Sequence, residues 1–437
     1  MSMDLRGCRG MLTDLMYTVY AKYSVTNQRP HPMDHAERPI LIVGAGQAGA
    51  RSLRALLDEG ITTPVILAGD EPHAPYDRPP LSKDLLKAFD PENADPLCSD
   101  AVLTAPNVEV RLGDPVTAID YDSSIATTAS GQRIGFGAMI IATGGRSRAL
   151  PLPGGELCTG LRNMDDCARL SQGLDKAKRI VVIGGGVIGL EVADAARARD
   201  IEVTVLEAGP RIMARILPPT ASQWLAQRHR AHGTDIRCGV TVERIETTGG
   251  HFTVTTDQGL FEADIVLAAI GMTPNTELAP AGALGPGGGI LTDTSGRIAG
   301  YDNLYAAGDV AESYNPHFGA HVRLETWRNA DRQPQAIART IAGRPAEHAE
   351  IPWMWTDQLG HNLQVVGFWN DSSEEVARGV PGEKGSSLYW TSDGVLAGGV
   401  LFDNGRDRRF LEALVQNKAN VPHETLSDPE VRLKKLA

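Results

Sequence analysis

Two stretches share one pattern: "ILIVGAGQAGARSLRALL" from Ile40 to Leu57, and "IVVIGGGVIGLEVADAARA" from Ile180 to Ala198. Each begins with a continuous apolar run, which is typical of a parallel strand buried on both faces. A glycine-spaced turn follows, and then a stretch with the small and apolar residues of a packed helix. The pattern predicts a strand–turn–helix unit at both places.

The first turn fits the spacing GxGxxG at Gly44, Gly46 and Gly49. In such a turn the first glycine permits the tight bend, the second lets the backbone approach a pyrophosphate, and the third allows close helix–strand packing. The helix is expected to end at Gly60, and "TPVILAGD" reads as the next strand. Asp70, which lies 21 residues after Gly49, is placed to bind an adenosine ribose.

The second turn repeats the spacing at Gly184, Gly186 and Gly189, with a helix expected over residues 187–199. Glu207 closes the next strand, 18 residues after Gly189. A carboxylate there accepts a hydrogen bond from the 2′-hydroxyl of NADH and repels the 2′-phosphate of NADPH. Arg211 and Arg215 follow shortly and leave some binding of NADPH open. One such turn alone also fits an ordinary strand–helix corner, but two complete units predict two bound dinucleotides.

The composition sets the class of protein. The chain has 437 residues and a net charge of −12, with 42% hydrophobic and 22% charged residues, which suits a globular α/β protein of two or three domains. The acidic balance argues against nucleic acid, and no stretch is apolar enough for a membrane helix. The five cysteines are spaced too widely for a disulfide framework or a metal site, which favours the cytoplasm; they are Cys8, Cys98, Cys158, Cys167 and Cys238.

The predicted fold class is α/β, with two Rossmann-like dinucleotide-binding domains and a C-terminal α+β domain. Residues 1–36 are interpreted as a disordered extension, with a start near Met33 or a targeting segment as alternatives. The first, FAD-binding domain comprises residues 37–152 and 272–330, the NAD-binding domain residues 153–271, and the C-terminal domain residues 331–437. "VEVRLGD" and "TTASGQRIGF", between the two units, read as hairpin-like segments.

Five motifs resemble those of a known family: "YDRPPLSK", "IATGGRSR", "GGGVIGLE", "YAAGDVAE" and "ETWRNADRQ". In this order they are similar to the glutathione-reductase-like ferredoxin reductases of Rieske-type aromatic dioxygenases, such as biphenyl dioxygenase, and of bacterial haem-thiolate monooxygenases, such as the putidaredoxin reductases. The tail segment "PWMWTDQLGHNLQVVG" strengthens the likeness, which covers residue 39 to the C-terminus.

The resemblance implies site residues of three kinds. For FAD they are Gly44, Gly46, Gln47, Ala48, Gly49, Asp70, Arg78, Lys83, Val116, Ala142, Thr143, Gly144, Asp309, Glu325, Thr326 and Trp327. For NAD they are Gly184, Gly186, Val187, Ile188, Gly189, Glu191, Glu207, Arg215 and Gly271. Lys83, Glu191 and Trp327 are the candidate catalytic residues, and no metal site is implied. Plainer roles stay open: surface ion pairs for Arg78 and Lys83, a helix-surface charge for Glu191, a helix cap for Asp309 and a core position for Trp327.

The expected function follows from this resemblance. Electrons pass from NADH through FAD, one at a time, to a 2Fe–2S ferredoxin that serves a ring-hydroxylating dioxygenase or a haem monooxygenase. Thiol-dependent relatives are disfavoured because no cysteine lies between Gly44 and Lys83. A rubredoxin reductase, an NADH oxidase, or a non-enzymatic flavoprotein resembling apoptosis-inducing factor are the alternatives. A monomer or weak homodimer is expected, without membrane or nucleic-acid partners. Five arginines are candidates for docking the ferredoxin: Arg328, Arg332, Arg406, Arg408 and Arg409.

Overall fold

The computed structural model describes residues 38–437, so the interpretation of residues 1–36 lies outside the described residues. The first Rossmann-like unit is present as predicted. Its parallel sheet has the order β18 (Leu304–Ala306), β7 (Ala138–Ile141), β1 (Ile40–Val43), β2 (Val65–Ala68) and β3 (Val108–Arg111). Helix α2 (Gln47–Asp58) joins β1 to β2, and its buried Leu53 and Leu56 supply the apolar face that the sequence indicated.

One expectation for this region was wrong. The segment "VEVRLGD" contains β3, which pairs parallel with β2 at the edge of the main sheet and belongs to no hairpin. Only "TTASGQRIGF" contributes to an antiparallel layer, which consists of β4 (Val116–Asp120), β5 (Ile125–Thr128) and β6 (Arg133–Gly135). A short apolar strand carries no mark of its partner's direction, because either direction buries the same side chains.

The second unit is built in the same way. Its parallel sheet has the order β11 (Thr234–Cys238), β10 (Glu202–Glu207), β9 (Arg179–Ile183) and β15 (Ile265–Ala268). Helix α6 (Val187–Arg197) follows the glycine turn, and α7 (Pro219–Ala231) precedes β11. An antiparallel layer lies beside this sheet, formed by β12 (Val242–Thr248), β13 (His251–Thr256) and β14 (Gly259–Ala263).

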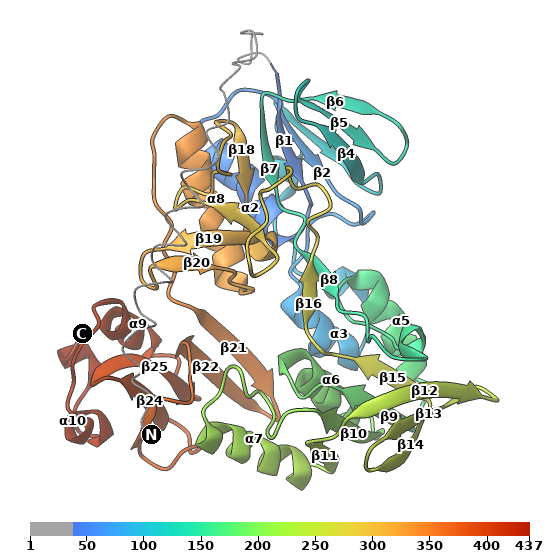
Figure 1. Ribbon diagram of the computed structural model, residues 1–437, viewed down its shortest axis with the longest axis vertical. Coiled ribbons are helices and arrows are strands. Elements are labelled where there is room, and N and C mark those ends of the chain that lie inside the picture. Colours follow the sequence, from blue (N-terminus) through green and yellow to red (C-terminus); the bar gives the residue numbers. More distant parts are fainter. Residues whose placement is uncertain (1–37) are drawn as a thin grey trace, which may run out of the picture. The chain divides into compact units, whose positions relative to one another are not determined.

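The chain leaves and re-enters the first unit through two paired strands. β8 (Gly145–Ser147) leads toward the second unit, and β16 (Met272–Pro274) returns antiparallel to it, as Figure 1 shows. After the return come β17 (Ile290–Thr292), β19 (Ala311–Asn315) and β20 (Ala320–Val322), which form a small sheet. The chain thus turns back toward the first unit at Met272.

The C-terminal part is an antiparallel sheet covered by helices. The strand order is β21 (Trp353–Gln358), β22 (His361–Gly367), β25 (Val395–Phe402), β24 (Ser387–Ser392) and β23 (Glu374–Arg378). Helices α9 (Arg408–Gln416) and α10 (His423–Ser427) and the 3-10 turn η7 (Leu433–Lys435) pack on it. The α+β character expected for this part is confirmed.

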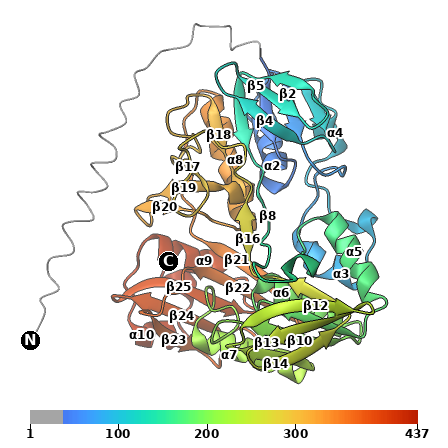
Figure 2. The same cartoon turned by 45° about the vertical axis from the view of Figure 1, so that its right-hand side comes forward.

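The predicted boundary between residues 330 and 331 divides helix α8 (Trp327–Ile341). This helix packs along α2 (Figure 2), and its Ile337 and Ala338 lie in the same core as Leu53 and Leu56. The helix therefore belongs to the FAD-binding part as far as Ile341, and the C-terminal sheet begins only at Trp353.

The first segment also contains four short helical turns, η3 (Pro79–Ser82), α3 (Asp84–Lys87), η4 (Pro91–Asn93) and α4 (Asp100–Leu103). Val102 of α4 lies in the core of the first sheet, whereas η3 and α3 pack away from that sheet. Leu81, Leu85 and Leu86 share one buried cluster with Leu190 of α6 and with Leu170 of α5 (Met164–Leu174), which follows η5 (Gly155–Leu157). The same cluster includes side chains of the C-terminal sheet, such as Leu363 and Trp390. Within residues 38–437 no helix is long and apolar enough to cross a membrane.

Candidate functional site: two dinucleotide sites

The N-terminus of α2 is open to an anion. Its N-cap is Gly46, no side chain caps it, and its first turn carries no acidic residue. Gly44 has a φ of 110°, and a Cβ there would lie 2.2 Å from the carbonyl oxygen of Ala142. A Cβ on Gly49 would lie 1.8 Å from the carbonyl oxygen of Gly44. Free N–H groups at a helix N-terminus bind phosphate, so this cradle fits a pyrophosphate.

Polar side chains around this cradle also fit an anionic cofactor. Arg78 reaches over the helix start, with Nη2 3.5 Å from the position of a Cβ on Gly46. Arg78 Nη2 also donates to Glu71 at 2.6 Å. Both polar atoms of the Gln47 side chain are buried and have no hydrogen-bond partner among the described residues. Buried amide groups are normally paired, so Gln47 also points to a ligand at this place.

A second cluster faces the site from the other side. Asp309 forms an ion pair with Arg162 at 2.9 Å, and Arg162 Nη2 lies 3.3 Å from the position of a Cβ on Gly144. Thr143 donates from its hydroxyl to the carbonyl oxygen of Asn275 at 2.7 Å. Arg162 was missed by the sequence analysis, although it stands in "GLRNMDD", directly before the capping box of α5.

The remaining predicted FAD residues are more varied in placement. Asp70 is exposed just beyond β2, and Ala48 and Ala142 are buried beside the turn. The Val116 side chain is buried in the core at the start of β4, so only its backbone is free to meet a ligand. Glu325 is exposed and paired with Arg323.

Trp327 is fixed at the start of α8. Thr326 caps this helix by accepting from the Asn329 N–H at 3.2 Å, and Trp327 Nε1 donates to Asp77 at 2.8 Å. Burial raises the pKa of the Asp77 carboxyl, while the Trp327 hydrogen bond opposes that rise. Asp77, a second residue that the sequence analysis missed, thus orients the indole ring.

The second glycine turn repeats the geometry of the first. Gly186 is the N-cap of α6, with no capping side chain and no acidic residue in the first turn. A Cβ on Gly184 would lie 2.4 Å from the Ala269 carbonyl oxygen, and one on Gly189 would lie 2.2 Å from that of Gly184. Val187 begins the helix, and Ile188 is 43% exposed beside it, which leaves the helix start accessible.

Glu207 holds this turn in place. Its carboxylate accepts the N–H of Gly185 at 2.7 Å and the N–H of Gly209 at 2.7 Å. Arg211 is turned away, because it donates to the carbonyl oxygens of Leu217 and Ala214.

The two remaining NAD residues lie together. Arg215 Nη2 lies 3.8 Å from the position of a Cβ on Gly271. The two residues are distant in the sequence, and the fold brings them close together, as expected if both contact one NAD molecule.

Lys83 and Glu191 meet where the two units adjoin. Lys83 Nζ lies 3.5 Å from Glu191 Oε1 and 3.3 Å from Asp357 Oδ2 of β21. Glu191 is only 4% exposed, and its Oε2 accepts from the Ser82 hydroxyl at 2.5 Å. Burial raises the pKa of Glu191, and Lys83 opposes that rise. Glu191 is therefore no free helix-surface charge but part of a buried polar contact.

The fold and these sites define an oxidoreductase with two dinucleotide-binding sites. Residues 38–333 match the family described as pyridine nucleotide-disulphide oxidoreductase, and residues 353–437 match the domain described as reductase C-terminal. The chain belongs to the pyridine nucleotide-disulphide oxidoreductase family.

Two curated relatives are ferredoxin reductases. The chain is 34% identical to the anthranilate 1,2-dioxygenase system ferredoxin–NAD(+) reductase component of Burkholderia cepacia, over 91% of this chain and 98% of that protein. It is also 34% identical to the 3-phenylpropionate/cinnamic acid dioxygenase ferredoxin–NAD(+) reductase component of Photorhabdus laumondii subsp. laumondii, over 87% and 97%.

Solved structures of ferredoxin reductases have a similar fold. The ferredoxin reductase for the CYP199A2 system of Rhodopseudomonas palustris superposes with a TM-score of 0.86 at 32% identity, over 91% of this chain and 100% of that one. The putidaredoxin reductase in its covalent complex with putidaredoxin gives 0.85 at 29%, over 91% and 98%. The expected fold class and the expected family of ferredoxin reductases are confirmed, and FAD and NAD(H) are the cofactors of that family.

Proposed function

We propose that this chain is an NADH-dependent reductase that passes electrons through FAD, one at a time, to a 2Fe–2S ferredoxin of an aromatic dioxygenase or haem monooxygenase system. The observation that carries the proposal is the contact between Lys83 and Glu191, 3.5 Å apart, where the two dinucleotide-binding units adjoin. A hydride donor and a hydride acceptor bound in these units would meet beside this pair.

FAD, when bound, supplies two-electron acceptance from NADH and one-electron release to an iron–sulfur protein. Gln47, Arg78 and the α2 N-terminus would hold its pyrophosphate, and Asp309, Arg162 and Thr143 would face the linker between its pyrophosphate and its ring. Glu207 and the α6 N-terminus would hold NADH. Lys83 lies between the Glu191 and Asp357 carboxylates, where its amino group would stabilise negative charge that develops on the cofactor.

An aromatic series leads outward from Trp327. Its ring lies 5.8 Å, between centroids, from that of Trp355, and Trp355 is stacked 5.1 Å from Trp353. Arg408 covers Trp353 with its guanidinium 4.8 Å from the ring centroid. All three tryptophans are partly exposed. This series supports Trp327 as the start of an electron exit route that ends on the C-terminal sheet.

The docking residues need one correction. Arg328 is only 4% exposed and is paired with Glu350 and Glu412, so it is a structural cation. Arg408 pairs with Glu412 at 2.8 Å, and Arg332 lies 3.6 Å from Glu350. Arg332, Arg406 and Arg409 are exposed.

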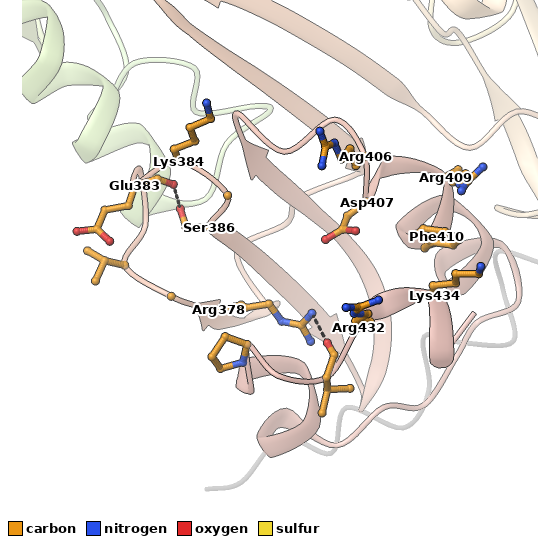
Figure 3. Close-up of a pocket in the computed structure, with 15 residues that line it drawn as sticks. Arg378, Glu383, Lys384, Ser386, Arg406, Asp407, Arg409, Phe410, Arg432 and Lys434 are labelled. Atoms are coloured by element: carbon orange, nitrogen blue, oxygen red, sulfur yellow. Dashed lines mark hydrogen bonds between the residues drawn. The ribbon is translucent and has the colours of Figure 1, made fainter.

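Arg406 and Arg409 line a surface hollow of about 770 Å³ in the C-terminal part. Six basic side chains from β23, α9, η7 and the adjoining loops line it, and Figure 3 labels them: Arg378, Lys384, Arg406, Arg409, Arg432 and Lys434. Arg378 is buried and donates to backbone carbonyl oxygens, whereas the other five are exposed. Only Glu383 and Asp407 oppose them. We call this surface the basic hollow.

The basic hollow is complementary to an acidic ferredoxin. It stands out on a chain whose net charge is −12, and complementary potentials steer association and fix orientation. Arg409, which lines it, follows directly after Arg408, which covers Trp353. The hollow and the outer end of the tryptophan series are therefore adjacent through the first turn of α9.

The proposal includes a cytoplasmic location and a monomer or weak homodimer. The cytoplasmic location is supported by the free cysteines among the described residues, Cys98, Cys158, Cys167 and Cys238, because free thiols are usual in a reducing compartment.

Comparing electron acceptors tests the proposed function. The FAD-loaded protein is supplied with NADH, and NADH consumption is followed with a plant-type 2Fe–2S ferredoxin, a rubredoxin or oxygen. Faster turnover with ferredoxin is expected. Turnover that prefers rubredoxin or oxygen would support the rubredoxin reductase or the oxidase instead, and no turnover with any acceptor would support a non-enzymatic flavoprotein.

A further inference from the structure

Glu191 stands at the end of a series of buried polar side chains. Its Oε1 accepts from the Thr356 hydroxyl at 2.6 Å. Gln358 Nε2 donates to the same Thr356 oxygen at 2.8 Å, and Gln358 Oε1 lies 2.6 Å from Nε2 of His229. His229 and Thr356 are 0% exposed and Gln358 is 2% exposed. No bulk water reaches these groups, so their hydrogen bonds are made with one another.

The ionised carboxylate at one end fixes the direction of every donor. An ionised Glu191 only accepts, so the single Thr356 hydroxyl proton points to it. Gln358 must then donate its amide N–H to Thr356 and present its oxygen to His229. His229 therefore carries its proton on Nε2, and its Nδ1, which has no partner among the described residues, is the unprotonated nitrogen. The hydrogen positions follow from this network.

The series joins three parts of the molecule. Thr356 and Gln358 are alternate residues of β21 and so point to one face of that strand. His229 comes from α7 and Glu191 from α6, both in the second dinucleotide-binding unit. Ser82, from the first segment, donates to the other carboxylate oxygen. Ser82 and Thr356 therefore donate directly to the Glu191 carboxylate, and His229 acts on it through Gln358 and Thr356.

We propose that Thr356, Gln358 and His229 are positioning residues that hold Glu191 as an oriented carboxylate beside Lys83 at the nicotinamide site. The inference rests on the proposed function, because it assumes that NADH binds beside Lys83 and Glu191. Donors aligned in one direction polarise one another and strengthen the final bond to the carboxylate. The C-terminal sheet then sets the charge state of the hydride-transfer site.

The charged and titratable groups on every element packed against α6 belong to this account. Lys83 faces Glu191 from the end of η3, and Asp357 of β21 holds Lys83 from the outside. Asp194 of α6 is paired with Lys87 of α3 at 3.7 Å. The others are Arg197 of α6, Asp84 of α3, Arg228, His229 and Arg230 of α7, the exposed His232 just after α7, Arg179 of β9, and Glu202 and Glu207 of β10. Only Lys83 among these cations is within 4 Å of the Glu191 carboxylate.

The sign of the expected change follows from these contacts. Burial raises the pKa of Glu191, while Lys83 and the Ser82 and Thr356 hydroxyls lower it. Loss of the Thr356 hydroxyl removes one lowering contact, so the pKa rises further. Glu191 then takes up a proton at a higher pH than in the parent protein. A hydrogen bond to a charged group is worth enough for a shift of about one pH unit.

The test is an infrared titration of the oxidised, FAD-loaded protein. The absorption of the protonated Glu191 carboxyl is identified by its loss in Glu191→Gln and followed against pH. Thr356→Val should move the midpoint up by about one pH unit, and Gln358→Leu should move it in the same direction by less. Thr356→Ser, which keeps the hydroxyl, should return it to the parent value.

Thr340→Val is the matched control, since Thr340 is also buried but donates to Ala336 within α8. An unchanged midpoint in both Thr356→Val and Gln358→Leu, or an equal shift in Thr340→Val, would overturn the proposal. If Thr356→Val does not fold, Gln358→Leu and Thr356→Ser decide alone. The titration requires no turnover. If NADH does not reduce the parent protein, the proposed function is wrong, but the titration still tests whether these residues position Glu191.

Discussion

Glu207 shows how one residue can shape a site and select its ligand. Its two oxygens hold the N–H groups of Gly185 and Gly209, each at 2.7 Å. An ionised carboxylate has about four acceptor positions, so positions remain for the hydroxyl groups of an adenosine ribose. Arg211, which could have received a 2′-phosphate, is engaged with backbone carbonyl oxygens. We therefore propose that Glu207 favours NADH over NADPH, while the exposed Arg215 leaves some binding of NADPH open.

Glu207→Ala should weaken NADH binding and reduce the preference over NADPH. The variant loses a charged hydrogen-bond acceptor and the repulsion of the 2′-phosphate, so the ratio of kcat/KM for the two nucleotides should fall by roughly tenfold or more. Glu202→Ala, on the exposed start of the same strand, is the control and should leave the ratio unchanged. A ratio equally preserved in Glu207→Ala would show that other residues select the nucleotide.

For single residues, the sequence predicts those positions that a short motif fixes by its spacing. The glycines of both turns, Asp70 and Glu207 follow from the motif and lie where the motif requires. The partners of Asp309 and Trp327 do not, because Arg162 and Asp77 are 147 and 250 residues away along the chain. Such contacts are set by the packing of distant elements, so only the fold reveals them.

Helix α8 marks the limit of prediction for elements. It continues to Ile341 although it contains Pro334, a residue that ordinarily indicates the end of a helix. Burial of Ile337 and Ala338 against α2 compensates for the lost backbone hydrogen bond. Tertiary packing thus overrides the local signal. The predicted boundary at residue 330, which rested on a change in sequence texture, falls inside the helix because that texture does not show which core a helix joins.

The link between α8 and β21 should make stability depend on pH. His348, in this link, donates from Nε2 to the amide oxygen of Asn329 at 2.9 Å. Burial, with Arg332 and Arg328 nearby, lowers the pKa of His348 to about 4. The unfolded chain binds a proton near pH 6.5 and the folded one does not, so stability is lost as the pH falls below 6.5. Between pH 7 and pH 5 the loss should be about 2 kcal/mol.

Thermal or denaturant unfolding of the parent and His348→Gln at both pH values measures this effect. The variant should lose less stability on acidification, because glutamine does not titrate. His321→Gln, on the exposed strand β20, is the control and should behave as the parent does. An equal loss in parent and His348→Gln would assign the acid sensitivity to other groups.

One buried cluster joins several parts of the described molecule. It holds residues of the first segment, of one side of the second unit and of the C-terminal sheet, while the first sheet packs in two other clusters. The elements that carry Lys83, Glu191 and Thr356 are therefore packed together. The two Rossmann-like units could be predicted from sequence, because each repeats a local motif, while the nucleotide sites stay a prediction. The basic hollow could not be predicted, since its cations come from three separated segments, 378–386, 406–410 and 429–434.

Charge reversal in the basic hollow should slow electron transfer to ferredoxin. Arg409→Glu and Lys434→Glu should each lower the association rate on the order of tenfold at low salt, with a smaller effect at high salt. Reduction of ferricyanide should not change, since a small anion needs no docking surface. Arg133→Glu, on the exposed edge of β6, carries the same charge change as control. Equal loss with ferricyanide, or with Arg133→Glu, would contradict docking at this surface.

The most direct test of the central claim is the reductive half-reaction. The FAD-loaded protein is mixed with NADH without oxygen in a stopped-flow instrument, and the loss of flavin absorbance is followed before and after addition of 2Fe–2S ferredoxin. The account predicts rapid loss with NADH, slower loss with NADPH, and recovery when ferredoxin arrives. Failure of NADH to reduce the flavin would contradict the assignment of two cooperating dinucleotide sites that meet at Lys83 and Glu191.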